Sequence, residues 1–153
     1  MELNKKQISY FVLILIWMAI VFAFSNQPAE VSSRTSGGIT EKVVKLVTKD
    51  NKTITQSQRD QIETVIRKFA HFGLYLIGGF LIANFISTTK KLDEHIVIYS
   101  LLFTSMYACT DEIHQYFVEG RSCQLTDVII DACGAIVGIM SLKLYKNIVR
   151  RKK

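Results

Sequence analysis

The 153-residue sequence lacks the short motifs that mark many soluble enzymes. It contains no phosphate-cradling glycine loop, no Gly-x-Ser-x-Gly nucleophile elbow and no dinucleotide fingerprint. Its three cysteines form no metal-binding pair, and no His-x-x-x-His spacing occurs. We predict Cys109 and Cys133 to be small apolar fillers and Cys123 to be a free thiol in a loop. With these motifs absent, the informative features of the sequence are the patterns of its apolar and charged residues.

Four apolar runs are present instead, at about residues 8–24, 69–86, 96–110 and 128–142, in a chain with 49% hydrophobic residues. With flanking residues, each approaches the roughly 20 residues that a membrane-spanning helix needs. We therefore predict one all-α membrane domain over residues 1–153, a bundle of four transmembrane helices at about 8–24, 67–86, 95–116 and 125–145. The first run also resembles a signal peptide, because Ala23 and Ser25 offer a small-x-small cleavage site. Its length exceeds the usual core of about 7 to 15 residues, which favours an uncleaved anchor.

Lysines and arginines give the predicted orientation. Basic residues collect on the cytoplasmic side of membrane proteins. Their counts on the two sides are similar, but the dense basic tail at residues 143–153 favours a membrane protein with both termini in the cytoplasm. The net charge of +6 matches anionic lipid head groups as partners, and nothing in the sequence suggests nucleic acid.

The connecting segment at residues 25–66 is too polar to span a membrane. Ile39, Val43, Leu46 and Val47 recur at helical spacing, which predicts a short amphipathic helix on the membrane surface. Thr55 and Gln58 match a capping box that begins another helical turn. The alternative for the whole segment is a solvated connector that acts only as a spacer.

Ionisable residues lie at the predicted helix ends that share the outer face. Residues at i, i+4, i+7 and i+11 form one stripe of a helix. The last predicted helix places Asp127, Asp131, Gly134 and Gly138 on such a stripe, and the glycines would let a neighbouring backbone approach closely. Equivalent stripes carry Arg67, His71, Leu74 and Gly78 in the second helix and Ser100, Thr104, Tyr107 and Asp111 in the third. Charged groups at membrane depth usually mark a functional site, so we expect these stripes to face one pocket.

Carboxylate and imidazole groups of this kind serve acid and base catalysis, and guanidinium groups suit phosphate or carboxylate. In the predicted site His114 is the acid or base, Asp111 orients it, and Arg67 and Arg121 bind an anionic group, with Gly120 allowing the turn before Arg121. The full candidate set is His114, Asp111, Asp131 and His71 for catalysis, and Arg67, Arg121, Glu112, Gln115, Asp127 and Lys68 for substrate binding.

Each of these residues also has a purely structural interpretation. Asp131 would form a buried salt bridge to Arg67 or Arg121, and Asp127 would stabilise a helix start. Lys68 would snorkel to the interface, Glu112 would face solvent, and His71 would bond a neighbouring helix. We expect no cofactor, since ligand spacings are absent, although two histidines near carboxylates leave a divalent cation open.

Three stretches, FSNQPAEVSS, RKFAHFGLY and DEIHQYFVEGRSCQLTDVIIDACGAIVG, resemble the VanZ-like family of small bacterial membrane proteins. The resemblance implies a multi-pass protein associated with low-level resistance to the glycopeptide teicoplanin. The expected function is action on, or binding of, a cell-wall or lipid-linked anionic substrate in an outward-facing polar pocket. An enzyme of this kind would be an extracytoplasmic hydrolase or transferase. The alternatives are a binding or sequestering protein and a small lipid carrier, for which a homo-oligomer would be needed.

Overall fold

The computed structural model describes residues 4–28, 37–38, 40–42, 55–88 and 94–152. These residues contain four long helices, α1 (Lys5–Ser25), α3 (Gln56–Ser87), α4 (Glu94–Tyr116) and α5 (Leu125–Arg151), and no strand among them. All four helices are long and apolar enough to cross a membrane. The predicted all-α architecture with four spanning helices is therefore confirmed.

Side-chain caps fix the starts of the first two long helices. At α1, Asn4 and Gln7 form a capping box with two bonds of 2.9 Å. At α3, the Thr55 backbone N–H donates to Gln58 Oε1 at 3.0 Å, as the sequence pattern predicted. The helical turn predicted at Thr55 and the span predicted from about residue 67 form one continuous helix, because α3 begins at Gln56 and continues through polar residues before it becomes apolar.

Most of the predicted amphipathic helix, including Ile39, Val43, Leu46 and Val47, lies outside the described residues. The described positions 37–38 and 40–42 have helical backbone.

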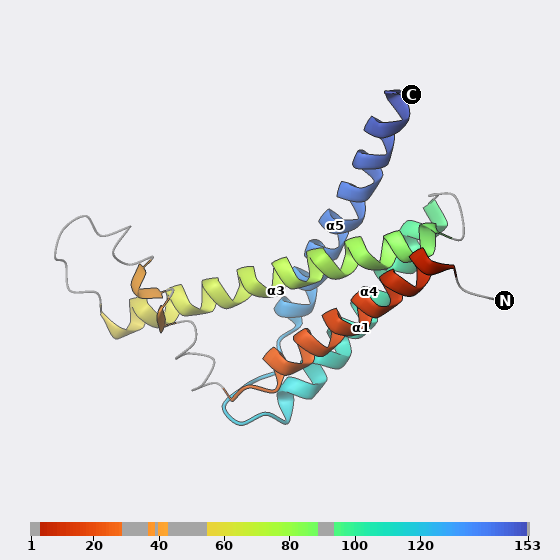
Figure 1. The fold of residues 1–153 in the computed structure, drawn as a ribbon. Coiled ribbons are helices and arrows are strands. Elements are labelled where there is room, and N and C mark those ends of the chain that lie inside the picture. The colour runs from red at the N-terminus through yellow and green to blue at the C-terminus, as the bar shows by residue number, and fades with distance from the viewer. Residues whose placement is uncertain (1–3, 29–36, 39, 43–54, 89–93, 153) are drawn as a thin grey trace.

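Glycines bring α3 and α5 into backbone contact. A Cβ added at Gly134 would meet the Phe72 carbonyl oxygen, and one at Gly138 would meet the Leu76 carbonyl oxygen. From the other helix, a Cβ at Gly79 would lie 2.8 Å from the Ala135 Cα. The predicted close approach at the GxxxG pair is confirmed, and it makes this crossing the tightest constraint on how α5 lies across α3 (Figure 1).

Trp17 joins α1 to this pair of helices. Its indole Nε1 donates to the Leu74 carbonyl oxygen at 2.8 Å, and its ring packs edge-on against Tyr75 with centroids 5.7 Å apart. A Cβ on Gly78 would strike the same indole, so this glycine makes room for the ring. Tyr107 of α4 packs on Trp17 as well and donates to the Met18 carbonyl oxygen at 2.8 Å. One aromatic centre therefore holds α1, α3 and α4 together.

Large apolar side chains cover the outside of the helices, for example Leu15, Phe103 and Met140. Such a surface suits lipid rather than water. Cys109 and Cys133 are also exposed on their helices, so their prediction as small apolar fillers of the packing was wrong. Cys123 is an exposed free thiol in the connection between α4 and α5, as predicted.

Figure 1 shows that the end of α1, the end of α4 and the start of α5 lie at the same end of the molecule, with the N-terminal half of α3 reaching across it. We call this end the rim. The start of α1, the end of α3 and the start of α4 lie at the opposite end of the molecule in the same figure. The chain therefore gathers its charged motifs at one end, while the apolar middle of each helix packs at the Trp17 and glycine contacts.

Candidate functional site

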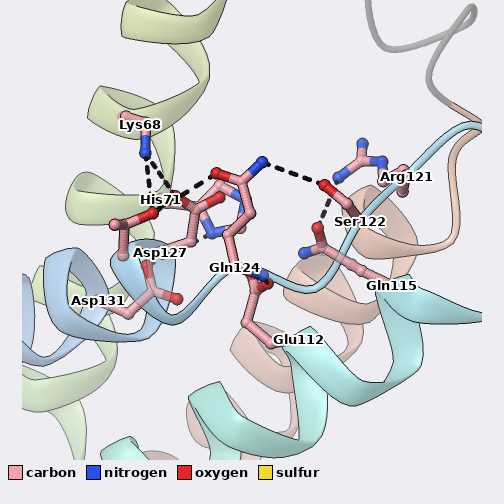
Figure 2. Close-up of polar contacts among 10 residues, drawn as sticks. Lys68, His71, Glu112, Gln115, Arg121, Ser122, Gln124, Asp127 and Asp131 are labelled. Carbon is pink, nitrogen blue, oxygen red and sulfur yellow. Dashed lines mark hydrogen bonds and ion pairs between the residues drawn. The ribbon is translucent and has the colours of Figure 1, made fainter.

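Four polar residues from three helices meet at the centre of the rim. His71 lies on α3, Asp111 and Glu112 on α4, and Asp131 on α5. One ligand atom from each of the four lies within 4.8 Å of the others. Figure 2 shows His71, Glu112 and Asp131 reaching from their helices toward the space between them. We call these four residues the acidic cluster.

Asp131 is the most deeply buried member of the acidic cluster. Its relative exposure is 0%, and neither carboxylate oxygen has a hydrogen-bond partner among the described residues. Its nearest charge partner is His71, whose Nδ1 lies 3.4 Å from Asp131 Oδ1 without a hydrogen bond. The predicted salt bridge to Arg67 or Arg121 was wrong, because His71 occupies the facing position on α3.

Glu112 is buried as well, with a relative exposure of 1%, so its predicted position facing solvent was wrong. Its Oε2 accepts a 2.9 Å bond from the backbone N–H of Gln124, the residue that precedes α5. Its Oε1 has no partner in the described part of the chain. Glu112 thus ties α4 to the start of α5 and leaves one oxygen available inside the acidic cluster.

Arg121 lies beside the acidic cluster in the turn before α5, and Gly120 before it has a φ of 73°, which favours glycine. The guanidinium donates to the carbonyl oxygens of Gln27 at 3.0 Å and Phe24 at 3.3 Å, and to Gln115 Oε1 at 3.2 Å. Gln115 Nε2 in turn donates to Asp111 Oδ2 at 3.2 Å. Arg121 therefore connects the end of α1 to α4 and reaches the acidic cluster through an amide.

Burial lowers the pKa of Arg121, and the positive charge of Arg67 lowers it further. An arginine remains charged at neutral pH despite such shifts, because its reference pKa exceeds 12. Arg67 itself is partly buried and forms no hydrogen bond or ion pair with other described residues. The two guanidinium groups thus lie near enough to repel each other, and neither has a carboxylate partner among those residues.

Lys68 and Asp127 form an ion pair at the edge of the site, with Lys68 Nζ 2.7 Å from Asp127 Oδ1 (Figure 2). Asp127 is in the first turn of α5, where the helix dipole also favours a carboxylate. Lys68 also lies 3.4 Å from the Thr126 hydroxyl. The predicted snorkelling of Lys68 was wrong, because the side chain holds α3 to α5.

His114 is not one of the four residues of the acidic cluster. Its ring stacks on Phe22 of α1 with centroids 4.7 Å apart, and its buried Nε2 has no partner among the described residues. No hydrogen bond joins it to Asp111 within that part of the chain, where Asp111 contacts Gln115 instead. The structure therefore pairs His71 with Asp131 where the sequence pattern paired His114 with Asp111.

Two further residues belong to the site and were not predicted. The Tyr75 hydroxyl is buried without a partner among the described residues, one turn along α3 from His71. Gln124 donates its backbone N–H to Glu112 and its side-chain amide to the Ser122 hydroxyl at 3.1 Å. The i+4 spacing of Tyr75 from His71 was a usable signal, whereas the bond from Gln124 depends on how the turn folds back.

The site therefore has two chemically distinct parts. The acidic cluster places three carboxylates and an imidazole in one buried group, which suits proton transfer or cation binding. Beside it, Arg67 and Arg121 provide positive charge for an anion.

A family model described as VanZ/LLP1 matches residues 10–146 of the chain. No curated protein and no solved structure gives a significant match. The matched range includes every residue of the candidate site.

Proposed function

Because the chain belongs to the VanZ/LLP1 family, we propose that this membrane protein binds the anionic head group of a lipid-linked or cell-wall precursor at the rim and thereby contributes to glycopeptide (teicoplanin) resistance. In this proposal the rim faces the outside of the cell and both termini lie in the cytoplasm, in agreement with the basic tail. Membrane lipids are then the immediate partners of the apolar helix surfaces.

The observation that carries this proposal is the pair of guanidinium groups that have no carboxylate partner in the described part of the chain. Arg121 uses neutral acceptors, and Arg67 has no partner among the described residues, although four carboxylates lie in the same site. An anion bound between two neighbouring positive charges offsets the repulsion between them. Phosphate and carboxylate groups match the fork of donors that each guanidinium offers.

Turnover of the bound group would use the acidic cluster. His71 and Asp131 are 3.4 Å apart, so a proton on the imidazole has a buried carboxylate beside it. This pair supports an extracytoplasmic hydrolase or transferase in which Arg67 and Arg121 position the anion. Simple capture of the precursor needs only the arginines.

The described residues give less support to transport of a lipid head group across the membrane. The polar stripe of α4 is closed, because Ser100 and Thr104 are fully buried and donate to carbonyl oxygens of their own helix at 2.7 and 2.9 Å. Such hydroxyls form a packed wall and offer no path to a polar head group.

The test measures binding of a polyprenyl diphosphate to the full chain in nanodiscs, with the uncharged polyprenol as the reference lipid. Loss of one charged hydrogen-bonding partner costs about 1.5 to 3 kcal/mol, so Arg67→Gln should weaken binding roughly 10- to 100-fold. Arg59→Gln is the matched control, because Arg59 is an exposed arginine on the same helix. Teicoplanin susceptibility of cells that express each variant should follow the binding result.

Equal binding of the diphosphate and the alcohol would overturn the proposal, as would equal effects of the two arginine substitutions. A His71→Gln variant separates chemistry from capture. Retained binding with lost resistance supports turnover, and retained resistance supports capture alone.

A further inference from the structure

We propose that His71, Asp111, Glu112 and Asp131 bind one divalent transition metal ion of the Zn²⁺ or Mn²⁺ type. The inference rests on the acidic cluster alone and does not depend on the proposed anion binding.

The distances within the acidic cluster suit a single ion. One nitrogen of His71 and one oxygen of each carboxylate lie within 4.8 Å of one another. Four ligands at about 2.1 Å from a tetrahedral zinc ion are separated by roughly 3.4 Å. Side-chain torsion changes that move each ligand atom by about 1 Å would close the difference between these two separations, with no movement of the helices.

Unsatisfied polar atoms provide the second, independent observation. Both oxygens of Asp131, Oε1 of Glu112 and Nδ1 of His71 are buried and have no hydrogen-bond partner among the described residues. A buried carboxylate without donors is costly, by several kcal/mol in effective terms. Buried carboxylates are normally paired, hydrogen-bonded or bound to a metal. Among the described residues Asp131 accepts no hydrogen bond, and its charge partner His71 is itself a member of the acidic cluster.

The remaining atoms of the acidic cluster are held as a metal site requires. Gln124 fixes one oxygen of Glu112, and Gln115 fixes one oxygen of Asp111. Bonds of this kind orient metal-binding carboxylates in known sites. Glu112 keeps its Oε1 for a ligand, since this atom has no partner among the described residues. The three helices that supply the cluster are held together independently by the glycine and tryptophan contacts.

The chemistry of the donors selects the class of metal. Imidazole favours zinc, iron, copper and nickel, whereas carboxylates also suit manganese, magnesium and calcium. One nitrogen with up to three carboxylates therefore favours Zn²⁺ or Mn²⁺ over Mg²⁺ and Ca²⁺, which prefer sites made of oxygen alone. The absence of thiolates from the cluster argues against softer ions.

A bound cation would also change the charge that the rim presents. Three carboxylates repel an anion, and a divalent ion would offset most of that repulsion. Arg67 and the metal would then attract the same anionic group from two sides.

The experiment uses the purified full chain in nanodiscs after treatment with a chelator. ZnCl₂, MnCl₂, MgCl₂ and CaCl₂ are each titrated by calorimetry, and bound metal is counted by mass spectrometry. We expect one Zn²⁺ or Mn²⁺ per chain, and a weakening of about 100-fold or more in Asp131→Asn, since even outer-shell changes cost about 10- to 100-fold. His95→Gln and Glu119→Gln are matched controls, because both residues are exposed and lie outside the cluster.

Thermal melting of the metal-free forms keeps the test decisive. Asp131→Asn replaces a buried carboxylate that accepts no hydrogen bond from the described residues by a neutral amide. The metal-free variant should therefore melt no lower than the metal-free wild type, whereas only the wild type should gain stability when metal is added. Preference for Mg²⁺ or Ca²⁺, failure to bind any of the four ions, or equal binding by Asp131→Asn and Glu119→Gln would each overturn the proposal. Metal binding is read without any lipid substrate, so its failure is distinguishable from failure of the anion-binding proposal.

Discussion

Replacing Gly138 by alanine tests whether contact between the α3 and α5 backbones sets the geometry of the rim. The added Cβ would lie 2.9 Å from both the Leu76 carbonyl carbon and the Phe80 nitrogen, whereas ordinary contact begins at 3.4 Å. The Leu76 carbonyl oxygen would lie closer still, and all three atoms belong to the backbone, so the helices themselves must separate by more than 0.5 Å. Overpacking of this kind costs about 1 to 3 kcal/mol.

Gly73→Ala is the matched control, because a Cβ at Gly73 meets nothing within 4 Å. Alanine is a better helix former than glycine by about 1 kcal/mol, so this variant should be neutral or more stable. The two substitutions add the same methyl group to transmembrane helices and are predicted to act with opposite sign.

The assay is thermal unfolding of each variant in the same nanodiscs, followed by circular dichroism. Gly138 lies two turns along α5 from Asp131, so separation of the helices should also increase the distance between His71 and Asp131 and weaken metal binding. A Gly138→Ala protein that melts with the wild type, or a Gly73→Ala protein that is equally destabilised, would refute the reasoning.

Two other predictions concern the rim. Lys68→Met leaves Asp127 without its cation at a relative side-chain exposure of 6% and should lower the free energy of unfolding by about 1 to 3 kcal/mol. Adding Asp127→Asn to this variant should restore part of the lost stability. In the same denaturation assay Lys143→Met, at an exposed lysine of α5, should have little effect. Equal losses in Lys68→Met and Lys143→Met would contradict the role of the ion pair. Cys123 should react with a membrane-impermeant maleimide on intact cells, whereas Cys109 and Cys133, exposed on spanning helices, should not. Reaction of Cys123 only after permeabilisation would reverse the proposed orientation.

Much of the fold follows from local sequence features. Apolar runs located the four spans, Thr55 and Gln58 marked the start of a helix, and the spacing of Gly134 and Gly138 predicted close packing. Each of these features depends on residues within one helix, or on a residue that has no side chain. It can therefore be recognised in a single sequence. Hydropathy placed the span only from about residue 67, because it marks where lipid begins, whereas the helix continues through polar residues back to Gln56.

Pairings between helices were harder to predict. Helical periodicity gives the direction in which a side chain points but not the residue it faces. His71 was therefore recognised as a site residue, whereas its partner Asp131 was expected to form a salt bridge with an arginine. Glu112 shows the same limit, since its burial depends on the turn that brings the Gln124 N–H onto its carboxylate.

The length of α3 gives a measure of how deep the acidic cluster lies. His71 is 16 positions before Ser87, the last residue of the helix, which corresponds to about 24 Å along the axis at roughly 1.5 Å per residue. The hydrocarbon layer is about 30 Å thick, so an upright helix that leaves the layer at Ser87 would hold the imidazole about 6 Å below the opposite boundary. A water-soluble molecule would have to descend to reach that depth. The diphosphate of a long isoprenoid lies in the head-group region just above that boundary. Such a lipid would enter sideways between the helices with its tail still dissolved in the bilayer.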